Sequence, residues 1–369
     1  MANRPPHILV GHSVRYLAQS ARRAGLPVVA VDAFGDTDTL AAAGQIRRVA
    51  RPSPADLGRG FVGLDIGADA TWSYGAGFES APDSLAAMRR RRLGLLGSAP
   101  AVLRLLAHPT RLFALLNDLD IPVPEIAWQR PAHPDGWLFK NAGSQGGNGV
   151  WRVAEAPGTA RGYYQRYLPG PVHSLLFAAD GKAMRGIAYN RLEPRDARLG
   201  DFRFNRVLGD QVPPTPAAEQ MQRAAVRLTR TLGLRGVNGL DFVLQQDRAL
   251  LLDINARPPA SLELYESLLP GGGLATHLAA CRGRLPAPLP AGRPGGLQIV
   301  YAEQDTPVGA PHWPDWARDR PRPGSLVRAG DPLCSVHARA DEAACLSDLL
   351  EQRALAAQFL IAQSNGVAA

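Results

Sequence analysis

The chain has 369 residues, which is too long for one compact core and predicts two or three domains. Its apolar fraction of 46% is that of an ordinary globular protein, and no apolar run approaches the ~20 residues of a membrane span. The first residues lack the hydrophobic segment of a signal peptide, so we expect no membrane segment and a cytoplasmic protein. Three scattered cysteines, Cys281, Cys334 and Cys345, argue against a disulfide framework and a cysteine-type zinc site.

The formal net charge of +8 raises the question of a nucleic-acid partner. The longest basic run begins at Arg89 and has no interleaved aromatic residues of the kind that stack on bases, so we expect no nucleic acid. A solvated helix face or a site for an acidic substrate are the remaining interpretations of that run. Lys140 and Lys182 are the only lysines, and in so arginine-rich a chain they mark places where a compact ammonium group is needed.

The chain opens with a predicted strand–helix–strand unit. Residues 7–11 and 27–32 are short apolar runs, and the segment between them has a helical pattern with Ser13 as its N-cap. Gly11 is a single glycine where the dinucleotide fingerprint needs three, which argues against an NAD-binding alternative at this place. The acidic loop 32–39 follows the second strand at the edge where α/β sheets bind ligands, and it is either a ligand loop or a plain connector.

The following elements are read from periodicity and turn residues. Strands are predicted at 61–67, at both ends of 136–153, in 163–170, in a hairpin over 173–189 with an Asp-Gly turn, in a second hairpin over 237–259, and at 297–304. Helices are predicted at 85–107, from 108 to the proline-bounded segment before residue 125, at 216–233 with Gly233 as its C-terminal cap, and at 340–364, whereas 71–80 is predicted as a flexible loop. The Pro/Gly-rich stretch after residue 283 marks a domain boundary.

Three polar residues alternate where the strand LLDIN meets two prolines. Asp253, Asn255 and Arg257 have period-2 spacing, so their side chains share one face, and Asp241 on the partner strand of the hairpin can join them. Carboxylate and amide oxygens suit Mg²⁺, and an arginine suits phosphate oxygens. The pattern predicts a metal–phosphate site at the end of this hairpin, against the alternative of a solvated hairpin end.

A glycine-rich loop follows the strand that ends in Lys140. Its small residues leave backbone N–H groups free to surround phosphate oxygens; they are Gly143, Ser144, Gly146, Gly147 and Gly149. No Lys-Ser/Thr pair follows the last glycine, so this is not a Walker A loop. The loop taken alone fits an ordinary flexible hairpin better than a phosphate site, and Lys140 beside it raises the case for phosphate binding.

The order of strand, lysine, glycine loop and then Asp-x₁₁-Asp-x-Asn-x-Arg resembles the ATP-grasp superfamily over nearly the whole chain. The resemblance implies an α/β protein with the ATP-grasp fold, in which two α+β subdomains hold ATP between them. It implies a Rossmann-like pre-ATP-grasp domain at 1–105, an ATP-grasp domain at 106–282 with a lid at about 125–190, and a β-rich C-terminal extension with a closing helix at 283–369.

The resemblance also implies roles for particular residues. Lys140 corresponds to the lysine on the α- and β-phosphates, and Arg257 to the arginine near the transferred phosphate. The implied nucleotide-binding residues, besides Lys140 and the loop, are Arg111, Gln165, Tyr167, Leu168 and His173. The implied ligands of one or two Mg²⁺ ions, with Mn²⁺ as an alternative metal, are Asp241, Asp253 and Asn255. Asp253 and Gln165 depart from the superfamily, which usually has a glutamate at the first position and often an acid at the second.

Several segments resemble ATP-dependent carboligases related to biotin carboxylase; they are GHSVRYLAQSARRAG, NGLDFVL and PRPGSLVRAGDPLCSV. That branch is associated with tetrahydromethanopterin- and methylofuran-dependent one-carbon metabolism. The implied activity is ligation of a small-molecule carboxylate to an amine or thiol through an acyl phosphate, with a homodimer left open. An ATP-binding regulatory protein without turnover is the alternative. Substrate candidates are His12, Ser13, Arg203 and Glu263. Arg203 and Arg206 fit either an acidic substrate or a solvated surface, with the second favoured, and Glu263 and Tyr265 equally fit the start of a helix.

Overall fold

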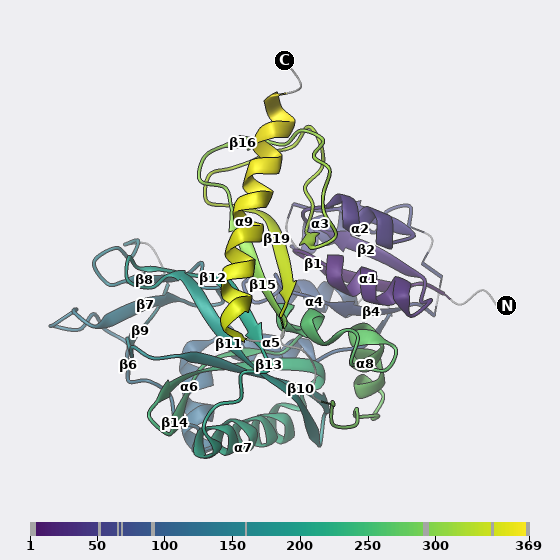
Figure 1. Cartoon of the computed structure of the whole chain (residues 1–369). Coiled ribbons are helices and arrows are strands. Elements are labelled where there is room, and N and C mark those ends of the chain that lie inside the picture. Colours follow the sequence, from purple (N-terminus) through teal and green to yellow (C-terminus); the bar gives the residue numbers. More distant parts are fainter. Residues whose placement is uncertain are drawn as a thin grey trace.

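The computed structural model describes residues 5–50, 53–64, 66–67, 69–89, 93–158, 161–290, 295–340 and 343–366. It contains a parallel sheet at the N-terminus, a small antiparallel sheet, and a large antiparallel sheet that runs through the middle of the molecule (Figure 1). Within this described part of the chain, no helix has both the length and the apolar character needed to cross a membrane. Most of the basic run, residues 90–92, lies outside the described residues.

The N-terminal sheet has the strand order β3-β2-β1-β4-β5, with all pairs parallel. Its strands are β1 (His7–Gly11), β2 (Val28–Asp32), β3 (Gln45–Arg48), β4 (Thr71–Tyr74) and β5 (Gly94–Leu95). Its helices are α1 (Arg15–Arg23), α2 (Thr37–Ala42), α3 (Pro54–Gly60), α4 (Asp83–Arg89) and α5 (Pro100–Leu106). Every residue of β1 and β2 is buried, as expected for strands that helices cover on both faces. The predicted strand–helix–strand opening is confirmed.

Three local predictions in this domain are wrong. The strand lies at Thr71–Tyr74 rather than at 61–67, because Trp72 and Tyr74 are fully buried in the core while Gly63 and Gly67 hold positive φ angles typical of turns. Ser13 is not the cap of α1, because the helix begins at Arg15 and Asp32 Oδ2 accepts the backbone N–H of Val14 at 2.7 Å instead. The helical segment 85–107 is two helices, α4 and α5, separated by β5.

The small sheet has the strand order β6-β9-β7-β8. Its strands are β6 (Ile126–Ala127), β7 (Trp137–Asn141), β8 (Val150–Arg152) and β9 (Gly162–Arg166), and they follow helix α6 (Pro109–Asp118). The glycine-rich loop connects β7 to β8, as predicted. The small sheet ends at Arg166, so residues 172–190 of the segment expected to form a lid lie in the large sheet.

The large sheet has eight antiparallel strands in the order β14-β13-β10-β11-β12-β15-β19-β17. They are β10 (Val172–Asp180), β11 (Met184–Asp196), β12 (Asp201–Gly209), β13 (Arg235–Gln245), β14 (Arg248–Asn255), β15 (Gly295–Tyr301), β17 (Ala317–Arg318) and β19 (Pro332–Arg339). The remaining elements are α7 (Thr215–Leu232), the 3-10 helix η1 (Ala260–Tyr265), α8 (Gly272–Cys281), β16 (Thr306–Pro307), β18 (Leu326–Val327) and α9 (Ala343–Gly366). Strands from the C-terminal region therefore extend the sheet that carries the predicted metal–phosphate hairpin.

Helix α7 ends at Gly233, whose φ of 65° is the left-handed conformation that the sequence predicted for its cap. The largest core cluster is shared between regions, since it joins Trp72 and Phe78 of the N-terminal domain to Leu228 of α7 and Phe242 of β13. The N-terminal sheet and the hairpin are consequently packed as one body, which holds the carboxyl ends of β1 and β4 against the hairpin end.

A buried ion network joins the N-terminal domain to the C-terminal region. Arg15 of α1 is only 4% exposed. Its guanidinium donates to Glu263 of η1 at 2.5 Å and to both carboxylate oxygens of Asp319 at 3.0 and 3.1 Å. Arg15 therefore connects α1, η1 and the residue after β17. Its loss would leave two buried carboxylates without a cation, which is costly.

Replacement of Arg15 by alanine is expected to lower the free energy of unfolding by about 3–5 kcal/mol, because two buried carboxylates lose their partner. Chemical denaturation of wild type and variant measures the change. Arg23→Ala is the matched control, because Arg23 lies on the same helix and its ion pair with Glu266, at 2.9 Å, is half exposed on the arginine side; it should cost less than about 1 kcal/mol. Equal losses in the two variants would contradict the buried-network interpretation.

Candidate active site

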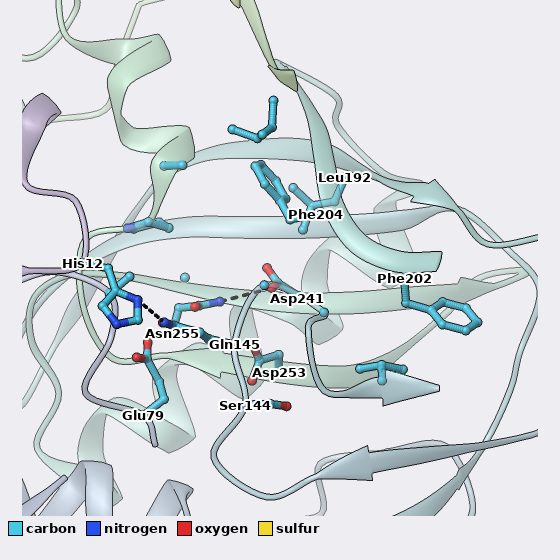
Figure 2. Close-up of a pocket in the computed structure, with 18 of the residues that line it drawn as sticks. His12, Glu79, Ser144, Gln145, Leu192, Phe202, Phe204, Asp241, Asp253 and Asn255 are labelled. Atoms are coloured by element: carbon cyan, nitrogen blue, oxygen red, sulfur yellow. Dashed lines mark hydrogen bonds between the residues drawn. The ribbon is translucent and has the colours of Figure 1, made fainter. Parts of the chain in front are cut away.

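A cavity of about 1120 Å³ lies between the N-terminal sheet, the small sheet and the large sheet. The order of the N-terminal sheet reverses between β1 and β4, and the loops that follow these two strands, with His12 and Gly75, form part of the cavity wall. Crevices at such reversal points are where open α/β sheets bind ligands. Figure 2 shows His12, Glu79, Gln145, Asp241, Asp253 and Asn255 around one space.

The end of the β13–β14 hairpin supplies the carboxylates of the site. The register pairs Asp241 with Asp253 and Gly239 with Asn255, as the alternation in the sequence predicted. Asn255 Nδ2 donates to Asp241 Oδ2 at 3.1 Å, which leaves the amide oxygen as the atom for a ligand. Burial and the neighbouring Asp253 carboxylate raise the pKa of Asp241 to about 7. Two adjacent carboxylates and an amide oxygen form a donor set that fits a hard divalent cation such as Mg²⁺.

Arg257 is held by a glutamate that the sequence analysis did not single out. Arg257 Nε donates to Glu79 Oε1 at 2.7 Å, and the backbone N–H of Gly77 donates to Glu79 Oε2 at 2.8 Å. Burial acts to raise the pKa of Glu79, but the ion pair with Arg257 outweighs it and holds that pKa below its usual range. The Tyr74 hydroxyl donates to the carbonyl of Ala256 at 3.1 Å and ties the same loop region to the hairpin end.

The glycine-rich loop lies between the N-terminal domain and β12. Gly77 N–H donates to Gln145 Oε1 at 2.9 Å, and Gln145 Nε2 donates to His12 Nδ1 at 3.1 Å. On the other side, the N–H of Phe204 donates to the carbonyl of Gly146 at 2.9 Å. The loop is therefore positioned over the cavity by contacts with both regions.

Glycine is required at Gly147 of this loop. Gly147 has a φ of +75°, and a Cβ atom there would collide with the carbonyl oxygen of Phe202. At Gly146, whose φ is +59°, a Cβ atom would meet nothing closer than 4.0 Å. The close approach of the loop to β12 therefore depends on Gly147 more than on Gly146.

Lys140 and Gln165 share a wall of the cavity. Lys140 Nζ donates to Gln165 Oε1 and to the backbone carbonyl of Leu252, each at 3.2 Å. Gln165 is 2% exposed, and Tyr167 and Leu168 line the cavity beyond it. Phe113 and Tyr163 also line the cavity, and their rings pack edge to face with centroids 4.9 Å apart. An aromatic lining of this kind suits a planar heterocycle.

The structure brings most of the predicted site residues to this cavity. Those that line it are His12, Ser13, Lys140, Gly143, Ser144, Gly146, Gly147, Gln165, Tyr167, Leu168, Asp241, Asp253, Asn255, Arg257 and Glu263. Four others do not line it: Arg111, Gly149, His173 and Arg203.

These four residues have other surroundings. Arg111 is exposed on α6. Gly149 packs beneath Ser144 inside the loop. His173 Nδ1 donates to the carbonyl of Gln211 at 3.1 Å, and Arg203 pairs with Asp201 at 2.6 Å. Period-2 alternation explains His173, because β10 turns it away from the wall that its neighbour Ser174 helps to form.

Substrate candidates outside the metal–phosphate site are also held by local partners. Glu263 is neutralised by Arg15, and Tyr265 is buried within η1, which matches the alternative that these residues begin a helix. Arg206 is buried between Glu193 and Glu351. Sequence reasoning missed Glu79 and Gln145, and the only signal for Glu79 was its place in the small-residue loop that follows β4.

The chain has the ATP-grasp fold, and residues 110–261 match the family model described as an ATP-grasp domain. This segment contains Lys140, the glycine-rich loop and the Asp241–Arg257 hairpin end.

Two kinds of curated relatives match part of the chain. A "Probable alpha-L-glutamate ligase" of Xanthomonas euvesicatoria pv. vesicatoria (strain 85-10) is 35% identical over 102 residues, 27% of this chain and 33% of the relative. A "Formate-dependent phosphoribosylglycinamide formyltransferase" of Anaeromyxobacter dehalogenans (strain 2CP-C) is 31% identical over 130 residues, 35% of this chain and 33% of that protein. The chain thus spans about a third of the length of these relatives.

Solved structures resemble the chain over almost its whole length. N5-carboxyaminoimidazole ribonucleotide synthetase from Thermus thermophilus has a TM-score of 0.70 at 16% identity, covering 92% of this chain and 95% of that one. The Staphylococcus aureus N5-carboxyaminoimidazole synthetase complexed with ADP has a TM-score of 0.70 at 12% identity, covering 95% and 97%. At these identities the similarity establishes the fold.

Replacement of Glu79 by glutamine tests the ion pair of the site. We expect a loss of about 1–3 kcal/mol in the free energy of unfolding at pH 7, because the Arg257 guanidinium loses its charged acceptor. The folded-state pKa of Glu79 lies below its usual value, so its stabilisation is present above that value and disappears as pH falls. The difference between variant and wild type should therefore shrink in acid, measured by denaturation at several pH values.

Glu219→Gln is the control for this variant, because Glu219 forms an exposed ion pair with Arg223 on α7. It should change stability by well under about 1 kcal/mol. A Glu79→Gln protein as stable as wild type at pH 7 would show that Arg257 does not depend on this partner.

Proposed function

We propose that the protein is an ATP- and Mg²⁺-dependent ligase that joins a small-molecule carboxylate to an amine and forms ADP and phosphate. One observation carries the proposal: Asp241, Asp253 and Asn255 converge at one hairpin end. They share a cavity with Arg257, Lys140 and the glycine-rich loop. This combination supplies metal ligands, cationic phosphate partners and backbone donors in one place, which phosphoryl transfer requires.

The hairpin end would hold the metal. Asp241, Asp253 and the amide oxygen of Asn255 are the residues to bind Mg²⁺, and the metal when bound supplies positive charge to the triphosphate. Asp253 is one methylene shorter than glutamate, so it reaches less far into the cavity than the residue usual in the superfamily.

The remaining residues would position the triphosphate and neutralise its charge. Lys140 lies where it can exchange Gln165 and the Leu252 carbonyl for phosphate oxygens. Arg257, fixed by Glu79, would neutralise charge on the transferred phosphoryl group. The backbone N–H groups of the glycine-rich loop would cover the phosphates and exclude water from a reactive acyl phosphate. The substrate carboxylate attacks the γ-phosphate, ADP leaves, and the amine then displaces phosphate from the acyl carbon.

The identity of the substrates is supported only by partial sequence similarities. The relatives named as probable alpha-L-glutamate ligases support glutamate as one of the two substrates. The carboligase branch that the sequence resembles supports a place in the biosynthesis of a one-carbon carrier cofactor. The carboxylate–amine chemistry itself does not depend on either assignment.

Trapping with hydroxylamine tests the ligase directly. Mg-ATP, a panel of carboxylates that includes L-glutamate, and hydroxylamine should give ADP, phosphate and a hydroxamate with wild-type protein. Asp241→Ala and Asn255→Ala should each lower this rate at least about 100-fold, since they remove metal ligands. Asp247→Ala, at the exposed turn of the same hairpin, is the matched control and should retain the wild-type rate.

Two results would overturn the proposal. Unchanged turnover in Asp241→Ala and Asn255→Ala would contradict the metal assignment. ATP binding with no hydroxamate across the whole panel would instead support an ATP-binding regulatory protein, for which Asp253 and Gln165 are the features in favour.

A pair of glycine variants tests the loop. Gly147→Ala is expected to raise the KM for ATP at least about tenfold, because the added methyl group pushes the loop away from β12. Gly146→Ala introduces a similar positive-φ strain of about 1 kcal/mol without a backbone collision, so its effect should be within about fivefold of wild type. Steady-state ADP release measures both. Equal effects would mean that the contact with Phe202 does not position the loop.

A further inference from the structure

A group of carboxylates lies on the N-terminal side of the cavity, away from the hairpin end. It is formed by the end of β2 with the loop and helix α2 that follow it, by η1, and by the residue after β17; the residues are Asp32, Asp36, Asp38, Glu263 and Asp319. Three of them, Asp36, Glu263 and Asp319, line the same cavity as the metal–phosphate site. The proposed ligation chemistry assigns no role to this group.

Four of these carboxylates already have partners. Asp32 accepts the N–H groups of Val14 and Gly35 at 2.7 and 2.5 Å. Asp38 accepts the N–H groups of Asp319 and Arg320 at 3.0 and 3.1 Å. Glu263 and Asp319 hold the guanidinium of Arg15. These four side chains therefore serve the local structure and the junction between regions.

Asp36 differs from the other four. Asp36 is the N-cap residue of α2, but its side chain makes no capping hydrogen bond and no other hydrogen bond or ion pair with any described residue. The residue is nevertheless only 7% exposed and lines the cavity. A carboxylate buried to this extent without a partner is costly, and such groups are normally paired. Asp36 is thus a buried acceptor that faces ligand space.

The charges around Asp36 are predominantly negative. Burial and the carboxylates of Asp319, Asp32 and Asp38 raise the pKa of Asp36 to about 9, and Arg15 offsets only part of this effect. His337, which packs against Glu263, is uncharged at neutral pH because burial lowers its pKa to about 4. The free protein therefore carries a proton on Asp36 at neutral pH, which a bound cation would replace.

The neighbouring arginines donate to backbone carbonyls, although Arg48 and Arg322 line the same cavity as Asp36. Arg320 donates to the carbonyls of Ala317 and Pro314, Arg322 to that of Gly35, and Arg48 to that of Ala33. Arg318 Nε lies 3.9 Å from Glu263 Oε1. No described basic side chain forms an ion pair with Asp36.

We propose that Asp36 receives the positively charged ammonium group of the amine substrate, a role that rests on the proposed ligase function. One carboxylate with free oxygens suits an ammonium ion, whereas a divalent cation needs several oxygen ligands at once. Phe34 of the same loop and Pro321 also line the cavity, so the wall fits the carbon chain of an organic cation. The site therefore selects an amine that arrives charged.

The position of Asp36 connects it to the rest of the site. Asp32, at the start of the same loop, holds the N–H of Val14, and His12 two residues earlier contacts Gln145 of the glycine-rich loop. A cation on Asp36 would therefore share one cavity with the glycine-rich loop and Tyr163.

Calorimetric titration with a panel of probes tests the proposal. The probes are butylamine, 1,4-diaminobutane and L-lysine, with 1-butanol and 1,4-butanediol as uncharged counterparts of similar shape. At neutral pH we expect at least one amine to bind wild type and the alcohols not to bind. Titrations in two buffers of different ionisation enthalpy should show release of about one proton per amine bound, because the cation replaces the proton on Asp36.

Asp36→Asn should weaken amine binding at least about tenfold and abolish the proton release. Asp305→Asn, which alters an exposed carboxylate paired with Arg328, should behave as wild type. Thermal melts of all three proteins confirm that they are folded. Equal amine affinity in wild type and Asp36→Asn, equal binding of amines and alcohols, or no binding of any amine would each overturn the proposal.

The ligase function and the ammonium site can fail separately. Hydroxylamine is mostly uncharged near neutral pH, so hydroxamate formation from Mg-ATP and a carboxylate reports on the metal–phosphate site. Amine binding without hydroxamate would refute the ligase while leaving a cation site on Asp36. Hydroxamate formation together with no amine binding would refute the Asp36 assignment alone.

Discussion

The antiparallel pairing of β13 with β14 is the constraint on which the rest of the site depends. It places Asp241 opposite Asp253 and brings Asn255 within 3.1 Å of Asp241, so two carboxylates and an amide meet at one edge of the large sheet. A shift of one residue in this register would turn these side chains to the opposite face. The buried core shared by β4, α7 and β13 holds that edge against the N-terminal sheet, and the cavity forms where they meet.

Charge is organised differently on the two sides of the cavity. At the hairpin end, Arg257 and Lys140 are engaged with Glu79, Gln165 and a backbone carbonyl, which are partners that phosphate oxygens can replace or complement. On the N-terminal side, Asp36 lines the cavity without a hydrogen bond or ion pair to any described residue. Such an arrangement suits an anionic triphosphate at one end and a cationic substrate at the other, each desolvated in the same enclosed space.

Much of the site was predictable because it depends on short-range geometry. Alternation along a strand brought Asp253, Asn255 and Arg257 to one face, and the hairpin required only an adjacent partner strand to add Asp241. Lys140 and the glycine-rich loop are contiguous in sequence, so their proximity was also predictable. The strand at Thr71–Tyr74 is not predictable from its sequence, because the small residues that follow it are typical of a loop. Trp72 and Tyr74 are buried in a core made by residues distant in the chain.

The sequence by itself determined the polar end of the β13–β14 hairpin, the glycine-rich loop and the order of the elements, because each depends on residues close together in the chain. Only the tertiary structure decided that Glu79 holds Arg257, that Gln145 reaches His12, and that Arg15 joins Glu263 to Asp319. These contacts span between 133 and 304 residues, and no local pattern encodes them. The unpaired state of Asp36 was likewise decided by the tertiary structure, because the residues that surround a buried carboxylate come from distant parts of the chain.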